Sequence, residues 1–239
     1  MAHSSTKQFT IMNKRLLLLL TLVFTSLTLQ AQEDLPPFKP FAHYINRTAM
    51  FEEAPTHDGA IIFLGNSITN LWEWAEFFEP SNGAAILNRG IGGDVTAGVL
   101  RRLDEVARHY PSKIFLMIGI NDFGSNPTNE YIVNNIDRII TTLQRKCPQA
   151  ELYLQSILPV NKEVFKDASP LQSSDNIRAV NAELQKVAKN RGIPYLDIFS
   201  LLLDPDTDML RASYTSDGIH LTAPAYRKWI NYITPLVNK

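Results

Sequence analysis

From residue 60 onward, short apolar runs alternate with longer segments of helical period. The apolar runs predict five strands, at Ala60–Leu64, Ala84–Leu87, Lys113–Ile118, Glu151–Ile157 and Pro194–Asp197. The segments between and after them predict helices, at Ile68–Phe78, Val95–His109, Pro127–Lys146, Ser174–Asn190 and Ala223–Val237. Strands that are separated by helices run parallel, because each helix serves as a crossover connection. The pattern therefore predicts an α/β fold: a three-layer α/β/α sandwich with a five-stranded parallel sheet.

The ends of the helices also have sequence signals. Asn126 followed by Pro127 predicts the start of one helix, since asparagine is a common N-cap and proline is favoured in the first turn. A further short helix is expected at His43–Glu53, against the body of the domain. With 239 residues, 45% of them hydrophobic, the chain suits one large domain, which we place at residues 41–239.

The amino-terminal region has the features of an export signal. Lys14-Arg15 precede an apolar stretch, Leu16–Leu29, and Ala31 offers a small residue for cleavage. This predicts a signal peptide at residues 1–31, a proline-rich linker at residues 32–40, and a protein exported to a bacterial periplasm or to the exterior. A transmembrane anchor is the alternative, but the run is short and contains threonine and serine. We expect no stable membrane insertion after cleavage.

Charge and metal-ligand patterns exclude several classes of function. Three of the 23 basic residues and none of the 24 acidic ones lie in the first 31 residues, so the remainder is mildly acidic. Without a Lys/Arg cluster, it is not expected to bind nucleic acid. Cys147 is the only cysteine, which excludes an internal disulfide. The histidines show no ligand spacing, and the sequence predicts neither a metal nor an organic cofactor. It leaves the oligomeric state open.

Ser67 follows the first predicted strand after a Gly65-Asn66 turn. The carboxyl ends of strands in open α/β sheets are where ligands bind, so this hydroxyl is a candidate nucleophile. The alternative is that Ser67 only caps the next helix.

Two further loops follow predicted strands. In Asn88–Asp94, the glycines allow close approach to a ligand, but Val95 stands where a dinucleotide fingerprint needs its third glycine. In Gly119–Asp122, the side chain of Asn121 can donate to a developing oxyanion, with a role in the turn as the alternative.

Near the end of the chain, Asp217 lies three residues before His220. In this arrangement the carboxylate can orient the imidazole while the second ring nitrogen faces a serine. On its own, such a pair is also compatible with a surface or capping role.

Taken in order, these four loops resemble the blocks of the SGNH (GDSL-type) hydrolase family, and especially its branch related to platelet-activating-factor acetylhydrolases. The resemblance covers residues from about 60 to 225 and implies a flavodoxin-like fold. It also implies that Ser67 is the nucleophile, that His220 is the general base and that Asp217 orients it. Ser67, Gly93 and Asn121 would then supply the oxyanion hole. One departure is Asn66, where many members have aspartate. The G-x-S-x-G motif of ordinary α/β-hydrolases is absent.

The sequence thus predicts a serine esterase that works through an acyl-enzyme. Our first hypothesis for its substrate is an O-acetylated carbohydrate, and the alternatives are an exported lysophospholipase or thioesterase, or a noncatalytic carbohydrate-binding protein. The expected partner is therefore a small-molecule or carbohydrate ester. The candidate substrate contacts are Asn66, Arg89, Trp72 and Tyr214, followed by Arg211, Trp74, Phe77 and Phe78.

Overall fold

A computed structural model describes residues 35–125 and 127–239. The chain divides into two compact units, Met1–Pro36 and Pro37–Lys239. The predicted signal peptide at residues 1–31, the first linker residues and Asn126 lie outside the described residues. The second unit begins at Pro37, slightly before our expected boundary at residue 41, and Phe38 packs against a buried apolar cluster of this unit.

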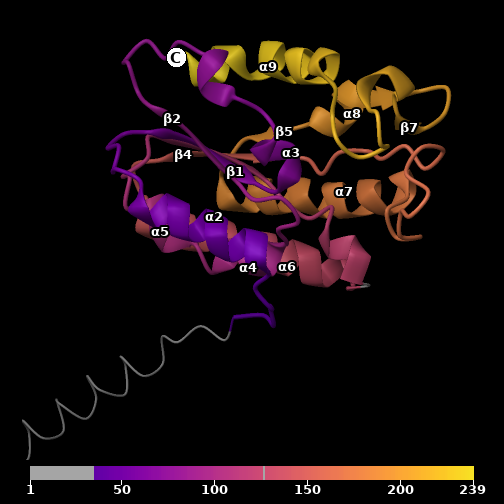
Figure 1. Cartoon of the computed structure of the whole chain (residues 1–239), viewed down its shortest axis with the longest axis horizontal. Helices are drawn as coiled ribbons and strands as arrows, with labels where there is room; N and C mark the ends of the chain where they lie inside the picture. Colours follow the sequence, from indigo (N-terminus) through magenta and orange to yellow (C-terminus); the bar gives the residue numbers. More distant parts are fainter. Residues whose placement is uncertain (1–34, 126) are drawn as a thin grey trace, which may run out of the picture. The chain divides into compact units, whose positions relative to one another are not determined.

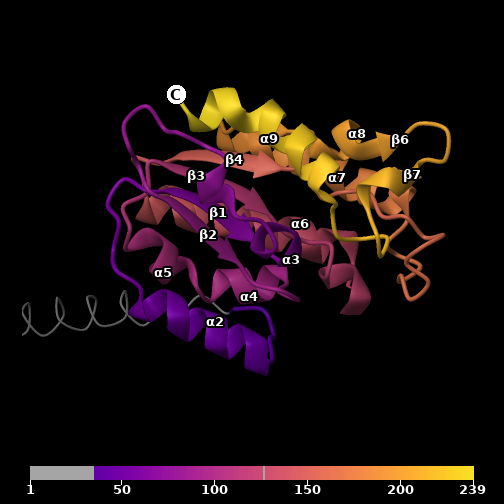
Figure 2. The same ribbon diagram turned by 45° about the horizontal axis from the view of Figure 1, so that its top comes forward.

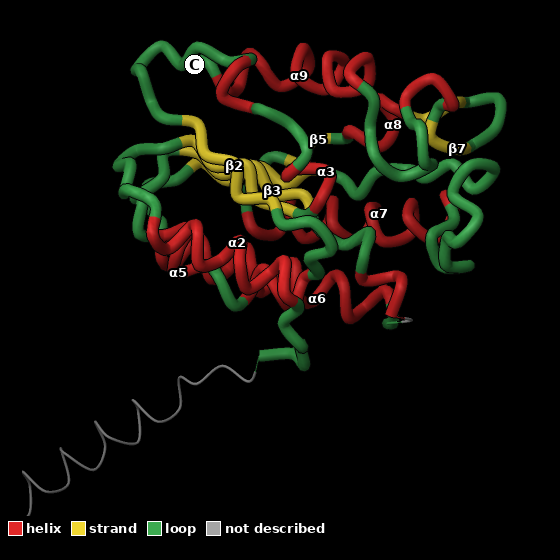
Figure 3. The backbone as a smooth tube through the Cα atoms, in the orientation of Figure 1, coloured by secondary structure: helices red, strands yellow, loops and turns green. Residues whose placement is uncertain are grey.

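Five parallel strands form the central sheet of this unit (Figures 1 and 3). They are β1 (Ile61–Gly65), β2 (Ile86–Gly90), β3 (Lys113–Met117), β4 (Glu151–Gln155) and β5 (Tyr195–Leu196), arranged in the order β2-β1-β3-β4-β5. The predicted five-stranded parallel sheet is confirmed. Because the order reverses beside β1, the carboxyl ends of β2, β1 and β3 lie together at the position where this strand order places a ligand site.

Helices cover both faces of the sheet, as predicted (Figure 2). One layer contains α4 (Thr96–Leu100), α5 (Leu103–Ala107), α6 (Asn129–Lys146) and α7 (Ser174–Arg191). The other contains α8 (Ile198–Leu202) and α9 (Ala223–Val237). The helix α2 (Ala42–Glu53) lies outside α4 and α5. The remaining elements are short: α3 (Ser67–Asn70), η1 (Trp74–Glu76), η2 (Asp122–Ser125), η3 (Ala212–Tyr214), and the antiparallel pair β6 (Leu203–Asp204) and β7 (Met209–Leu210).

Aromatic side chains fill the space between the sheet and α9. Phe63, Phe115 and Tyr153 are register partners on β1, β3 and β4, and their rings stack at centroid distances of 5.0 and 4.6 Å. Trp74 stacks on Phe63 at 4.2 Å and meets Trp229 of α9 edge-on. The two tryptophans are almost completely buried. These rings join three strands to the covering helix.

The prediction of one long helix at Ile68–Phe78 is wrong. The helix stops at Asn70, and η1 follows after a turn. In a continuing helix, the carbonyl of Thr69 would accept the backbone N–H four residues later. It instead accepts hydrogen bonds from Trp74 Nε1 at 2.8 Å and from Asn88 Nδ2 at 3.0 Å. Asn88 Nδ2 also binds the carbonyl of Trp72 at 2.9 Å. Side-chain donors therefore end this helix.

The helix expected at Val95–His109 is broken into α4 and α5. The break falls at Arg101 and Arg102, and Arg102 has φ −122°, which is not helical. This backbone conformation accompanies a side chain that is buried beneath the ends of β1 and β2, as described below. The other boundaries are close to those expected, although Thr128 and not Asn126 caps α6, since its hydroxyl accepts the N–H of Tyr131.

The buried guanidinium of Arg102 joins three segments. It donates to the carbonyl of Gly65 at 3.0 Å, to the carbonyl of Arg89 at 2.8 Å, and to the carboxylate of Asp94 at 2.9 Å. Both members of this ion pair are almost fully buried. No helix in the described part of the chain is long and apolar enough to cross a bilayer.

We predict that Arg102→Met lowers the free energy of unfolding by about 3–5 kcal/mol, because the substitution leaves Asp94 buried without its partner. Urea denaturation measures the loss. The control is Lys186→Ala, which removes an exposed ion pair with Glu183 and is expected to change stability by less than about 1 kcal/mol. A similar small loss for both variants would contradict the role assigned to Arg102.

Candidate active site

The fold brings together Ser67, His220 and Asp217. Ser67 is the first residue of α3, directly past the end of β1, and its Oγ lies 2.9 Å from Nε2 of His220. Nδ1 of the same imidazole lies 2.6 Å from Oδ2 of Asp217. Residues 153 positions apart in the chain therefore form one continuous hydrogen-bonded series.

Hydrogen bonds keep the carboxylate of Asp217 ionised. Burial acts to raise its pKa, but hydrogen bonds from the imidazole of His220 and from the N–H groups of Ile219 and His220 outweigh it and lower the pKa to about 2. An acceptor at Nδ1 assigns the proton of the neutral imidazole to that nitrogen. Nε2 is then free to accept the hydroxyl proton of Ser67.

A glycine shapes the turn between Asp217 and His220. Gly218 has φ +90°, and a Cβ there would lie 2.5 Å from both the carbonyl oxygen of Asn161 and the backbone nitrogen of Phe165. Only glycine fits such a close approach with a left-handed backbone.

Three residues that line this side of the site, Ser67, Gly93 and Asn121, carry candidate N–H donors. As the first residue of a helix, Ser67 has a backbone N–H without an intrahelical partner. Gly93 lines the same cavity with φ +80°. One N–H of Asn121 Nδ2 donates to the carbonyl of Asp94 at 2.9 Å, which orients the amide and leaves its second N–H for a ligand. This is the donor set that the resemblance implies for an oxyanion hole.

These groups border a cavity of about 630 Å³. Its volume is within the range of small-molecule sites. It is lined by His43, Ser67, Asn70, Leu71, Gly92, Gly93, Asn121, Phe165, Asp217, Ile219 and His220.

The four predicted substrate contacts do not line this cavity. Asn66 is buried, and its Oδ1 accepts the N–H of Ile68 as the N-cap of α3. Arg89 is buried in an ion pair with Glu105 at 2.9 Å. Trp72 stacks on Tyr226 at 4.3 Å. Tyr214, on η3, instead has the guanidinium of Arg211 5.7 Å from its ring centroid. Trp74 and Phe78 are core residues, and Phe77 stacks on Trp72.

Six lining residues were not among those predicted for the site: His43, Asn70, Leu71, Gly92, Phe165 and Ile219. Of these, Gly92 and Ile219 lie within two of the loops that the sequence singled out. Asn70 and Leu71 follow Ser67 by three and four positions, which is the spacing of one helix face, so the predicted helix contained the signal. His43 and Phe165 lie outside every motif, and nothing in the local sequence indicates them.

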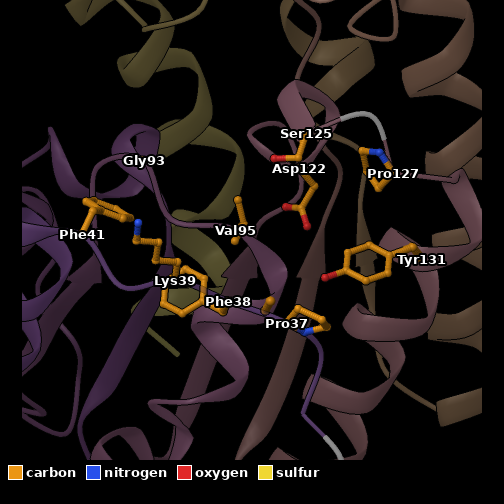
Figure 4. A pocket seen from close by; sticks show the side chains of 11 residues that line it. Pro37, Phe38, Lys39, Phe41, Gly93, Val95, Asp122, Ser125, Pro127 and Tyr131 are labelled. Carbon is orange, nitrogen blue, oxygen red and sulfur yellow. The ribbon is translucent and has the colours of Figure 1, made fainter.

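A second cavity, of about 420 Å³, also has Gly93 in its wall. Figure 4 shows Phe38, Lys39 and Phe41 on one side of it and Pro127 and Tyr131 on the other, with the carboxylate of Asp122 between them. Ser67 and His220 do not line it. No group of three potential metal ligands is found among residues 35–125 and 127–239.

Asp122 fixes the start of α4. Its carboxylate accepts the backbone N–H of Thr96 at 3.0 Å and the hydroxyl of Thr96 at 2.5 Å, and Asn135 donates to that hydroxyl at 2.9 Å. Burial raises the pKa of Asp122 to about 6, although the bonds from Thr96 act in the opposite direction.

The protein is an α/β sandwich in which a serine, a histidine and a carboxylate are hydrogen-bonded in series at the carboxyl edge of the sheet. This combination is typical of hydrolases. The sequence model described as the GDSL-like Lipase/Acylhydrolase family matches residues 63–228. The platelet-activating factor acetylhydrolase IB subunit alpha2 of Gallus gallus is 30% identical over 180 residues, which cover 70% of this chain and 71% of the relative. The Homo sapiens subunit is 29% identical over 182 residues, with the same coverage.

Solved structures of similar proteins have the same fold. A Streptococcus pneumonia protein described as a platelet activating factor is 27% identical, with a TM-score of 0.70 over 92% of this chain and 98% of that one. A Bacteroides fragilis NCTC 9343 protein described as an acylhydrolase is 26% identical, with a TM-score of 0.70 over 84% of this chain and 98% of that one. The chain belongs to the GDSL-like lipase/acylhydrolase family, as its resemblance predicted. It is an ester hydrolase.

We predict that Asp122→Asn removes a pH dependence of stability. A folded-state pKa of about 6, above that of the unfolded chain, makes the wild type lose stability as pH rises between about 4 and 6. From pH 4.5 to pH 7.5, the free energy of unfolding of the variant should therefore rise by about 2 kcal/mol relative to that of the wild type. Urea denaturation at both pH values measures this difference, and an equal difference at the two values would contradict it.

Proposed function

We propose that this ester hydrolase is a serine esterase that works through an acyl-enzyme. Ser67 is the nucleophile and His220 the general base. Asp217 orients the imidazole and stabilises its protonated form. The observation that carries this proposal is the unbroken series Oγ to Nε2 at 2.9 Å and Nδ1 to carboxylate at 2.6 Å, at the edge of a ligand-sized cavity.

The reaction has two halves. In the first, Nε2 of His220 takes the hydroxyl proton while Oγ of Ser67 bonds to the ester carbonyl carbon. The carbonyl oxygen becomes an oxyanion that accepts hydrogen bonds from the N–H groups of Ser67, Gly93 and Asn121. As the ester C–O bond breaks, His220 returns the proton to the departing alcohol. In the second half, His220 takes a proton from water while the water oxygen bonds to the acyl carbon. The bond between that carbon and Oγ of Ser67 then breaks, His220 returns the proton to Oγ, and the acid is released.

For the substrate, we propose an O-acetylated carbohydrate. Two observations support it. The matched relatives are named acetylhydrolases, which favours acetyl as the acyl group. A cavity of about 630 Å³ is much larger than an acetyl group, so most of it is available to the alcohol part of the ester. We also propose that residues 1–31 direct export, so that the enzyme meets its substrate in the periplasm or outside the cell.

A second candidate is a lysophospholipase or thioesterase with a long acyl chain. It is favoured by the apolar side chains in the cavity wall, Leu71, Phe165 and Ile219. A noncatalytic carbohydrate-binding role is disfavoured, because the side chains of Ser67, His220 and Asp217 are all present and hydrogen-bonded to one another.

We predict that Ser67→Ala lowers kcat/KM for p-nitrophenyl acetate by at least about 10⁴-fold, because it removes the hydroxyl oxygen that forms the acyl-enzyme. A fluorophosphonate probe should add its mass to the peptide that contains Ser67 in the wild type and to no peptide of the variant. Ser200→Ala, an exposed serine on α8, is the control. Activity retained by Ser67→Ala would exclude the proposed nucleophile.

We predict that kcat/KM for p-nitrophenyl esters is highest for acetate and at least about tenfold lower for octanoate. Each methylene without a matching surface changes the transition-state energy by about 1–3 kcal/mol, so an acetyl-selective enzyme discriminates clearly across this series. A preference for octanoate would replace the acetylesterase proposal with the long-chain alternative while leaving the serine mechanism intact.

A further inference from the structure

The helix α2 packs through a small apolar cluster of its own against the loop that contains Gly92 and Gly93, here called the glycine loop. Tyr44 and Phe51 of α2 are buried against Ile91, together with Phe38 and Phe41. The hydroxyl of Tyr44 donates to the carbonyl of Gly98 in α4 at 2.9 Å. This packing fixes α2 beside the loop that contains Gly92 and Gly93.

Electrostatic contacts reinforce this attachment. The ring of Phe51 contacts two guanidinium groups, those of Arg47 and Arg89, each 4.6 Å from its centroid. Arg47 also donates to the carbonyl of Gly90 at 3.4 Å. The end of β2 is therefore in direct contact with α2.

Docked in this way, α2 adds one side chain to the catalytic cavity, that of His43. Its Nε2 lies 3.4 Å from the position that a Cβ on Gly92 would occupy, and Oδ1 of Asn70 lies 3.9 Å from the same position. Two polar atoms from distant segments therefore approach one glycine in the cavity wall. The missing side chain at Gly92 leaves the space between them open.

Neither side chain, the imidazole of His43 or the amide of Asn70, has a hydrogen-bond partner in the part of the chain that the structure describes. The backbone of Asn70 is fixed, since its N–H bonds to the carbonyl of Asn66 at 2.9 Å and its carbonyl accepts from Asn88 at 3.2 Å. His43 is exposed and Asn70 half-buried, so both are accessible to a ligand in the cavity.

We infer that His43 and Asn70 form a polar subsite that binds hydroxyl groups on the alcohol part of the ester. The inference rests on the proposed function. An acetyl group has one hydrogen-bonding atom, the carbonyl oxygen, and the donors of Ser67, Gly93 and Asn121 are assigned to it. Polar atoms of the substrate that match an imidazole and a carboxamide must then belong to the alcohol part, as in a sugar. Because His43 lies outside residues 63–228, which match the family model, this subsite includes an element beyond the matched region.

The test compares two acetyl esters that differ in the alcohol part. One is an O-acetylated xylo-oligosaccharide with free hydroxyl groups, and the other is p-nitrophenyl acetate, whose alcohol part has none. The measured quantity is the ratio of kcat/KM for the first substrate to that for the second. We expect His43→Ala and Asn70→Ala each to lower this ratio by about 5–10-fold, the loss typical of a hydrogen bond, and the double variant to lower it further.

Two further variants separate hydrogen bonding from packing. His43→Gln keeps a donor and an acceptor and should recover part of the ratio that His43→Ala loses. Met50→Ala, an exposed residue on the same helix and outside the cavity, should leave the ratio at its wild-type value. A ratio unchanged in His43→Ala and Asn70→Ala, or a wild type inactive on the acetylated oligosaccharide, would overturn the subsite. If Ser67→Ala abolishes ester hydrolysis in the same assays, the serine esterase proposal stands even then. If it does not, the proposed function fails as well.

Discussion

The buried ion pair between Arg102 and Asp94 is the interaction on which the geometry of the site depends. A guanidinium presents five N–H donors in a fixed plane, and those of Arg102 reach the ends of β1 and β2 and the glycine loop at once. Asp94 supplies the opposite charge, without which burial of this arginine would be strongly unfavourable. Its own backbone carbonyl then holds the amide of Asn121. One ion pair thus links the segments that carry Ser67, Gly93 and Asn121, the three groups proposed to face the oxyanion.

The strands and the loops after them were predictable because their signals are local. An apolar run that ends at a glycine marks a buried strand and its carboxyl end, and Asp217 and His220 lie only three residues apart. The helix lengths were not predictable in this way. The carbonyl of Thr69 accepts hydrogen bonds from the side chains of Asn88 and Trp74, and Asn88 lies on β2, far from this helix in the sequence. The break at Arg102 has a similar origin, since its partners are the ends of two strands and a loop.

The error at Arg89 has a simple geometric reason. Successive residues of a strand point to opposite faces of the sheet, so Asn88 and Arg89 cannot serve the same surface. Asn88 turns toward α3 and fixes the backbone next to Ser67, whereas Arg89 turns toward α5 and pairs with Glu105. Gly92 and Gly93 of the loop after this strand line the cavity, but proximity in sequence does not say which of the neighbouring side chains reaches it. Trp72 shows the same limit, because its ring is used in stacking on Tyr226.

The proposed catalytic groups and His43, one of the two residues of the inferred subsite, are held by different parts of the structure. The former lie at the edge of the sheet, where the large core and the Arg102–Asp94 pair restrict movement of the backbone. His43 depends instead on the small cluster around Tyr44, Phe51 and Ile91, which is separate from the main core. Changes in α2 can therefore alter what lines the cavity at little cost to the sheet edge. The contact of Phe51 with Arg89, and that of Arg47 with the carbonyl of Gly90, are the points where the two parts meet. Both contacts involve β2, the strand that leads into the loop with Gly93, so the packing of α2 is joined to the part of the sheet edge that precedes this residue.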